Sequence, residues 1–326
     1  MSLDSDVLVD RRRIRRKLTF WRVTAVLVAI AAIVTVGVIA APATRAKLTA
    51  SGSIARVNID GLIRSDRERV EALERLEKSS VAAVIVHINS PGGTTAGSEQ
   101  LYDALTRLKA KKPLVVVVEG LAASGGYITA IAADHIVVQQ SSLVGSIGVL
   151  FQFPNFTELL KTVGVKVEEV KSSPLKAAPN GFEPTSPEAR AAIDALVKDS
   201  YAWFRGLVKA RRSMDDATLD KVADGRVFTG RQAVELKLVD ALGDEKTAVE
   251  WLVTQKNVTK DLPVRDYKLQ PRFGDLTFLR TAVSMTFDAI GLSTIARNIE
   301  QGGVTRAVDR LTLDGMLALW HPVGSN

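Results

Sequence analysis

The chain has 326 residues, of which 46% are hydrophobic and 24% charged, so it can fold around a sizeable core in one or two domains rather than remain disordered. It contains no cysteine, which excludes disulfides and thiolate metal sites. Its formal net charge of +7 does not indicate a nucleic-acid partner, because residues 1–22 hold seven basic and three acidic side chains and thus more than half of the excess.

Residues 23–41 follow this basic segment and carry no charge. As a helix rising about 1.5 Å per residue, they nearly span a bilayer core of roughly 30 Å, which predicts one transmembrane anchor. The positive charges before it predict a cytoplasmic N-terminus and an extracytoplasmic body. A cleavable signal peptide is the alternative, with small residues at Ala41-Pro42-Ala43, although the apolar run is longer than is usual for one.

Apolar strands and amphipathic helices alternate in the first half of the body. Residues 54–59, residues 81–88 and the run that begins at Pro113 have the pattern of strands. Residues 65–79 and 96–108 have apolar positions at helical spacing. Buried strands alternating with helices predict an α/β fold with a largely parallel sheet.

One serine stands where a strand would turn into a helix. The apolar run 115–118 is followed by small residues up to Ser124, and a helix-like segment covers residues 128–133. At such a turn the small neighbours let a substrate carbonyl approach, and the free N–H groups of the first helical turn favour negative charge. Ser124 is therefore a candidate nucleophile, although the same residues also suit an ordinary strand-to-helix turn.

A second turn, Asn89-Ser90-Pro91-Gly92-Gly93, ends the preceding buried strand. In open α/β sheets ligands bind at the carboxyl ends of the strands, so this turn and Ser124 belong to the same edge. Glycines there can direct backbone N–H groups at a substrate oxygen. Gly92 and Gly93 are therefore candidates for an oxyanion hole, and a plain Pro-Gly turn is the alternative.

No histidine is well placed to activate Ser124. His87 lies inside an apolar run, His135 follows 11 residues later at the far end of the intervening helix, and His321 stands near the C-terminus without an accompanying motif. A Ser-His-Asp triad is therefore disfavoured. Zinc chemistry is disfavoured as well, because no two histidines have ligand spacing, and we expect neither a metal nor another cofactor.

A lysine can take the place of a histidine if burial lowers its pKa towards neutrality. Lys176 is the candidate, because two prolines stiffen its loop and its nearest neighbours are apolar. The rivals Lys161, Lys166 and Lys171 lie in segments of alternating polarity that indicate solvated side chains. The residues alone leave this assignment open.

The remaining segments predict further helices. Thr185-Ser186-Pro187-Glu188 has the spacing of a capping box and begins a helix that runs to about Arg212. Residues 224–238 predict a turn leading into a helix, and residues 246–255 another helix. In the segment 256–326, apolar residues at roughly helical spacing predict peripheral or membrane-apposed helices at 278–292 and 304–320.

Four motifs together resemble the signal peptide peptidase A family, the membrane-anchored serine proteases of peptidase family S49. They occur in the family's order as Ile88–Gly93, Ala123–Tyr127, Gly145–Val149 and Asp224–Ala233. The resemblance covers about residues 50–255 and implies a ClpP/crotonase-like fold with parallel sheets and surrounding helices. With one copy of the domain, the chain is similar to the short form of the family.

The resemblance also implies roles for single residues. Ser124 matches the nucleophile, Lys176 the general base and Ser146 the hydroxyl that orients the lysine. The backbone N–H groups of Gly93 and Gly125 match the oxyanion hole. Family members form ring-like homo-oligomers in which neighbouring subunits can complete each active site, which implies an oligomer, expected to be an octamer.

The expected organisation is a basic cytoplasmic segment 1–22, an anchor 23–41, a protease domain 50–255 and an extension 256–326. The expected function is that of a serine endopeptidase with a Ser-Lys dyad in the bacterial inner membrane, which degrades cleaved signal peptides and other hydrophobic peptides. A stomatin-linked quality-control protease with the same dyad is one alternative. An inactive crotonase-like scaffold, in which Ser124 and Lys176 are dispensable, is another.

Overall fold

The structure is a computed structural model, and it describes Trp21, residues 52–269 and residues 317–319. Residues from Gly52 onward belong to one unit. In the described ranges no helix is both long enough and apolar enough to cross a membrane. The anchor predicted at residues 23–41 lies outside these ranges, as does the helix predicted at 278–292.

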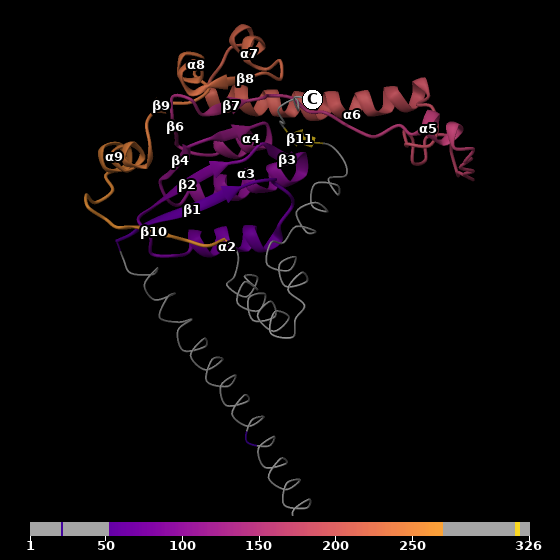
Figure 1. Cartoon of the computed structure of the whole chain (residues 1–326). Coiled ribbons are helices and arrows are strands. Elements are labelled where there is room, and N and C mark those ends of the chain that lie inside the picture. The colour runs from indigo at the N-terminus through magenta and orange to yellow at the C-terminus, as the bar shows by residue number, and fades with distance from the viewer. Residues whose placement is uncertain (1–20, 22–51, 270–316, 320–326) are drawn as a thin grey trace, which may run out of the picture. The chain divides into compact units, whose positions relative to one another are not determined.

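A six-stranded sheet forms the centre of this unit, in the order β10-β1-β2-β4-β6-β9 (Figure 1). Every neighbouring pair in it is parallel, which confirms the predicted α/β class. The strands are β1 (Ile54–Asp60), β2 (Ala83–Asn89), β4 (Leu114–Val118), β6 (His135–Val138), β9 (Ala241–Leu242) and β10 (Val264–Asp266).

Both faces of this sheet are covered, which explains why its central strands β2 and β4 are nearly continuous apolar runs. On one face Val84, Val86 and Val116 pack with α2 (Arg67–Glu77), α3 (Thr95–Lys109) and α4 (Gly125–Ala130). On the other face Ile85 and Val117 pack with α9 (Glu245–Lys256). The alternation of strand side chains therefore divides the core into two layers.

Three short strands form a second, smaller sheet in the order β5-β7-β8. They are β5 (Leu121–Ala123), β7 (Leu143–Gly145) and β8 (Val227–Thr229). A further two-stranded pair joins β3 (Gly92–Thr94) to β11 (Leu317–Leu319). These small sheets carry the turns that the sequence singles out at Ser124 and Gly93.

The remaining helices are α5 (Thr157–Thr162), α6 (Pro187–Arg212), α7 (Asp216–Val222) and α8 (Gly230–Glu235). The turn into a helix that is predicted at residues 224–238 is confirmed, because Thr229 and Gln232 form a capping box at the start of α8. Side-chain caps also begin α2 at Asp66 and α3 at Thr94.

Two local predictions are wrong. Helix α6 runs to Arg212, as predicted, but the capping residue differs, because Ser186 rather than Thr185 accepts the hydrogen bond from the N–H group of Ala189. Within the segment 304–320, residues 317–319 form a strand and not a helix, since they pair with β3. The main sheet also takes its edge strand β10 from the segment 256–326.

A buried tyrosine attaches α4 to the rest of the fold. The side chain of Tyr127 is 0% exposed, and its hydroxyl donates a hydrogen bond of 2.7 Å to the carbonyl oxygen of Leu238. We expect Tyr127→Phe to lower the free energy of unfolding by about 1 to 3 kcal/mol, because this carbonyl loses its buried donor. Urea denaturation measures the change.

Tyr102→Phe is the matched control, because the Tyr102 hydroxyl makes no hydrogen bond to a described residue and its side chain is only partly buried. Its expected change is within about 0.5 kcal/mol. Equal stabilities of the two variants would show that the bond to Leu238 does not hold α4 in place.

Candidate active site

Ser124 occupies a strained turn between β5 and α4. Its backbone dihedral angles are φ 54° and ψ −115°, which a residue with a side chain rarely adopts. Two hydrogen bonds hold this conformation: the Ser124 N–H group donates to the carbonyl oxygen of Gly145 at 2.8 Å, and the Ser124 carbonyl oxygen accepts from the N–H group of Ile128 at 2.9 Å. Strain of this kind at a strand-to-helix turn is typical of an activated nucleophile.

Ser146 lies beside Ser124 because their strands are paired. Strands β5 and β7 are parallel, with Ala123 opposite Gly145, so each serine is the next residue after this pair. Ser146 also has a positive φ of 51°, and its N–H group donates to the carbonyl oxygen of Arg226 at 2.8 Å. The structure therefore brings together two of the residues that the sequence predicts for the site.

Ser90 connects the glycine turn to the strand that leads to Ser124. Its N–H group donates to the carbonyl oxygen of Leu121 at 2.8 Å, and its carbonyl oxygen accepts from the N–H group of Ala123 at 3.1 Å. The Ser90 hydroxyl donates to the carbonyl oxygen of Gly61 at 2.7 Å and accepts from the N–H group of Gly92 at 3.1 Å. The two strand ends therefore meet at one edge, as the sequence predicts.

The predicted oxyanion glycines occupy positions where the backbone must come close. A Cβ atom at Gly93 would lie 1.8 Å from the carbonyl oxygen of Ile63, so no side chain fits there. Gly125 is the first residue of α4, where N–H groups have no acceptor within the helix. Gly126 packs against Ser90, since a Cβ atom there would lie 2.7 Å from the Ser90 carbonyl oxygen.

The structure does not bring Lys176 to Ser124 within one chain. Lys176 is exposed in the loop between α5 and α6, so it lacks the burial on which the sequence argument depends. The Ser124 side chain is 1% exposed, and its hydroxyl has a long contact of 3.5 Å with the carbonyl oxygen of Gly148. The described residues of a single chain thus supply no lysine partner for this hydroxyl.

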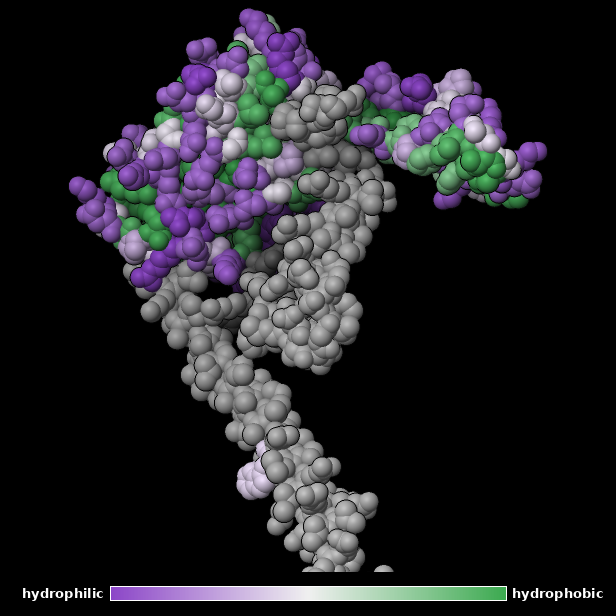
Figure 2. All heavy atoms as spheres, in the orientation of Figure 1, coloured by the Kyte–Doolittle hydropathy of each residue, from purple (hydrophilic) through white to green (hydrophobic). Residues whose placement is uncertain are grey.

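We call residues 151–196, which include Lys176, α5 and the first part of α6, the arm. The second half of α6 buries Phe204 and Val208 in the core, while the first half and α5 extend away from the sheet (Figure 1). Figure 2 shows apolar surface near the end of the arm. The exposed large apolar side chains of the arm are Phe156, Leu159, Val163, Val165, Val167, Val170, Leu175, Phe182 and Leu196. Exposed apolar surface of this kind is typical of an interface.

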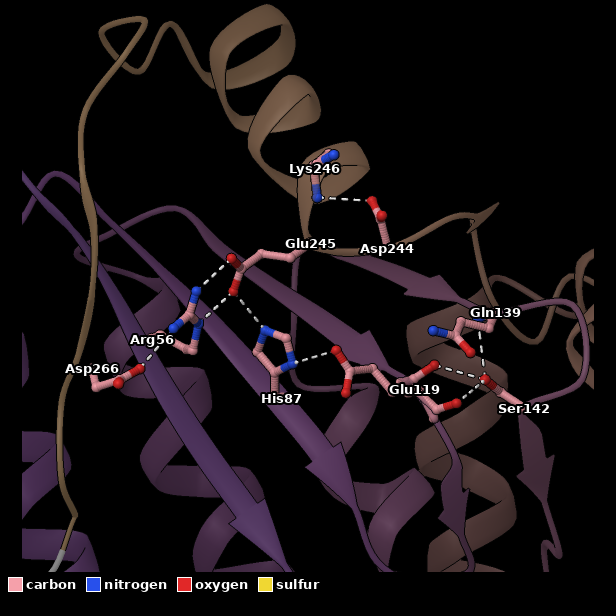
Figure 3. A network of polar contacts seen from close by, with 10 residues as sticks. Arg56, His87, Glu119, Gln139, Ser142, Asp244, Glu245, Lys246 and Asp266 are labelled. Carbon is pink, nitrogen blue, oxygen red and sulfur yellow. Dashed lines mark hydrogen bonds and ion pairs between the residues drawn. The ribbon is translucent and has the colours of Figure 1, made fainter.

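A network of ion pairs and hydrogen bonds, which the sequence analysis missed, lies on the face of the large sheet that α9 covers (Figure 3). The carboxylate of Glu245 contacts the guanidinium of Arg56 at 2.5 and 2.6 Å and Nε2 of His87 at 2.9 Å. Nδ1 of His87 lies 3.4 Å from Glu119. These side chains line a cavity of about 590 Å³. The alternation of Arg56 and Asn58 with apolar residues in β1 is the signal that could have indicated a polar face.

The two described histidines, His87 and His135, do not contact Ser124. His87 belongs to the network just described, and His321 lies outside the described residues. His135 stacks on Trp251 with ring centroids 4.6 Å apart, and burial lowers its pKa. In the described part of the chain, no group of three or more His, Asp or Glu side chains is arranged to hold a metal ion.

Comparisons with known proteins show the family to which the chain belongs. The family model of peptidase family S49 matches residues 106–259, and the Clp protease model matches residues 64–142. A Synechocystis sp. protein that carries a protease name, slr0021, is 36% identical over 217 residues, which are 66% of this chain and 78% of that protein. The chain therefore belongs to peptidase family S49.

Two further similarities extend this comparison. An Enterococcus faecium protein named for signal peptide peptidase SppA is 32% identical over 228 residues, covering 68% of this chain and 66% of that protein. Among solved structures, a mutant of ClpP1 from Listeria monocytogenes aligns with a TM-score of 0.42 and 16% identity. That alignment covers 60% of this chain and 94% of the ClpP1 chain.

The environment of His135 leads to a pH prediction. Burial lowers its pKa from 6.5, and this outweighs Asp240, whose carboxylate lies 3.8 Å from Nδ1 and acts in the opposite direction. In the window between the lowered pKa and 6.5, the unfolded chain binds a proton that the folded chain does not, so stability falls as the pH falls.

We expect His135→Gln to lose less stability than the parent between about pH 7 and pH 5, because glutamine takes up no proton. Urea denaturation of both proteins at a series of pH values measures the difference. Parallel losses in the two proteins would contradict the assignment of a buried, neutral His135.

Proposed function

We propose that this member of family S49 is a serine endopeptidase in which Ser124 is the nucleophile. The observation that carries the proposal is the strained turn at Ser124, which Ser90 fixes beside the glycine turn. A base would take the proton of the Ser124 hydroxyl as its oxygen attacks a peptide carbonyl. The N–H groups of Gly93 and Gly125 would stabilise the oxyanion that forms.

The reaction then divides into two steps of ordinary acyl transfer. The protonated base gives its proton to the leaving amine, and the acyl group stays on the Ser124 oxygen. Water, deprotonated by the same base, attacks this ester and releases the carboxylate product and the serine. Removal of an oxyanion donor from such a site costs on the order of 10²–10³ in kcat, so the position of Gly93 would contribute substantially to the rate.

We assign the base to Lys176 of a neighbouring copy. Lys176 is exposed in its own chain, and it lies on the arm, whose apolar surface is uncovered in a single chain. The 26 residues of α6 span about 39 Å as a helix, which is long enough to reach across a subunit boundary. Docking of the arm on another copy would bury both the apolar surface and the lysine, and this burial would favour the neutral amine.

The assembly that follows is a ring, since each copy gives its arm to one neighbour and receives an arm from the other. The octamer implied by the family resemblance fits this arrangement. In this assembly Ser146, beside Ser124, would accept a hydrogen bond from the incoming lysine and orient it.

Cleaved signal peptides and other hydrophobic peptides are the proposed substrates, and the similarity to a protein named for signal peptide peptidase supports this class. The proposed location is the bacterial inner membrane, with residues 23–41 as a single-pass anchor and the catalytic unit outside the cytoplasm. A membrane-anchored protease would meet its apolar substrates where they are released. A quality-control protease would use the same chemistry on other membrane-derived peptides.

A subunit-mixing experiment tests the shared site. Ser124→Ala and Lys176→Ala chains should each be inactive towards an apolar fluorogenic peptide. A 1:1 mixture, allowed to exchange subunits, should recover about one quarter of the parent activity, because a site is active when an intact serine meets an intact lysine from the neighbour. The rate should rise towards alkaline pH, since the base must be neutral.

Lys166→Ala is the control, because Lys166 is an exposed lysine of the same arm. It should keep the parent activity. A mixture that stays inactive would show that serine and lysine act within one chain. A folded, oligomeric parent without turnover would support the inactive scaffold instead.

Ser90 provides a second prediction. Ser90→Ala removes the hydroxyl that holds Gly92 and Gly61, so the oxyanion turn loses its fixed position. We expect kcat to fall about 10- to 100-fold with a much smaller change in KM, because the loss is specific to the transition state. Steady-state kinetics measure this split, and Ser141→Ala, at an exposed serine, is the control. Equal changes in kcat for both variants would contradict the positioning role.

A further inference from the structure

A loop outside the proposed catalytic residues holds the turn at Ser146. Residues 224–226 lead into β8, which pairs with β7 in antiparallel direction, with Val227 opposite Gly145. The carbonyl oxygen of Arg226 accepts the hydrogen bond of 2.8 Å from the Ser146 N–H group. A Cβ atom at Gly145 would lie 3.3 Å from this same oxygen. The Arg226 carbonyl group therefore lies against two successive residues, Gly145 and Ser146.

The loop is also close to the contacts of the candidate nucleophile. Gly145 has a positive φ of 98°, and its carbonyl oxygen accepts the hydrogen bond from the Ser124 N–H group. The Ser124 hydroxyl contacts the carbonyl oxygen of Gly148 at 3.5 Å, and a Cβ atom at Gly148 would lie 3.6 Å from the Cα atom of Gly225. The loop therefore approaches both residues whose carbonyl groups contact Ser124.

Packing does not hold this loop in place. Residues 224–226 are exposed, and the Cβ position of Gly225 has no neighbouring atom within 4 Å. The two ends of the loop are fixed, since the Tyr201 hydroxyl of α6 donates to the carbonyl oxygen of Ala223 and β8 pairs with β7 on the other side. A loop with so few buried contacts keeps its shape through polar contacts.

The carboxylate of Asp224 supplies these polar contacts. One of its oxygens accepts from the Arg226 N–H group at 3.2 Å, and the other lies 2.6 Å from Nε and 2.5 Å from Nη2 of Arg226. The first bond closes a turn over Gly225, as Asp and Asn side chains do when they bond to the backbone two residues further on. The hydrogen bonds from the Arg226 side chain lower the pKa of the Asp224 carboxyl, so this acceptor is ionised at neutral pH.

We propose that Asp224 is a positioning residue for the reaction: its carboxylate fixes Arg226, whose carbonyl group holds the turn at Ser146. Without this hold, Ser146 and Ser124 would lose the relative position that proton transfer requires, and a displacement of about 1 Å in such a site can cost on the order of 100-fold in rate. The effect of Asp224 on turnover rests on the proposed function, whereas its hold on Ser146 does not.

Two substitutions of Asp224 test this role by kinetics. Asp224→Ala removes both acceptors and should lower kcat for the apolar fluorogenic peptide about 10- to 100-fold, with less than about a twofold change in KM. Asp224→Asn keeps an oxygen that can accept from the Arg226 N–H group, so it should keep kcat within about threefold of the parent. Equal losses of kcat in the two variants, or a loss confined to KM, overturn the proposal.

Two controls separate positioning from a general loss of stability and from direct contact with the substrate. Asp220→Ala breaks a comparable exposed ion pair, with Arg205 at 2.5 Å, and should keep the parent kcat. Arg226→Ala keeps both backbone groups of residue 226 and should lower kcat by no more than about threefold. A loss in either control as large as that in Asp224→Ala overturns the proposal, because it assigns the effect to stability or to the guanidinium.

Hydrogen exchange distinguishes failure of this proposal from failure of the proposed function, because it needs no turnover. Exchange in the full-length protein is followed by mass spectrometry in peptides that contain the Ser146 amide. Asp224→Ala should speed this exchange at least about tenfold, and Asp224→Asn and Asp220→Ala should not. Unchanged exchange in Asp224→Ala overturns the proposal even if peptides are hydrolysed. Faster exchange, with a parent that hydrolyses no peptide, supports the hold on Ser146 and refutes the proposed function.

Discussion

The two hydrogen bonds between Ser90 and β5 are the link on which the rest of the site depends. Through them the end of β2, in the large parallel sheet, is joined to the strand that carries Ser124. The large sheet is packed on both faces, and Ser90 is one of the residues through which it is hydrogen-bonded to the small sheet. The Ser90 hydroxyl extends the same link to Gly61 and Gly92, so three chain segments share one junction.

The junction explains how the fold maintains an unfavourable backbone. Ser124 and Ser146 both have positive φ angles, and conformations of this kind cost on the order of 1–3 kcal/mol each. They persist because each serine N–H group has a backbone acceptor on another segment, Gly145 for Ser124 and Arg226 for Ser146. Both acceptors belong to the small sheet or to the residue that precedes it, so the neighbouring strands of that sheet hold the two turns.

The sequence predicted those parts of the site that depend on short stretches of chain. The strands, the glycine turn and the turn at Ser124 follow from apolar runs and small residues, and pairing of parallel strands then brings their ends together. The position of Lys176 could not be predicted in the same way. Its pattern indicates a stiff loop with apolar neighbours, but whether those neighbours are covered depends on contacts outside the single chain.

Two other features were beyond sequence reasoning for a different reason. The ion-pair network joins Arg56 of β1, His87 of β2 and Glu245 of α9, which are far apart in the sequence and have no common motif. The apolar residues of β11 suit a helix equally well, and they form a strand because they pair with the edge of β3. A local sequence pattern predicts a helix or strand when the segment's own residues decide its conformation. It fails when pairing with a distant segment decides between helix and strand.

The arm places the proposed activity under the control of assembly. A single chain holds Ser124 and the turn at Gly93 in position, yet Lys176, the proposed base, is exposed, and β11 pairs with β3 beside the candidate site. Docking of the arm would supply the base. Under the proposed function, docking of the arm precedes the cleavage of a peptide bond, which would limit turnover to assembled protein.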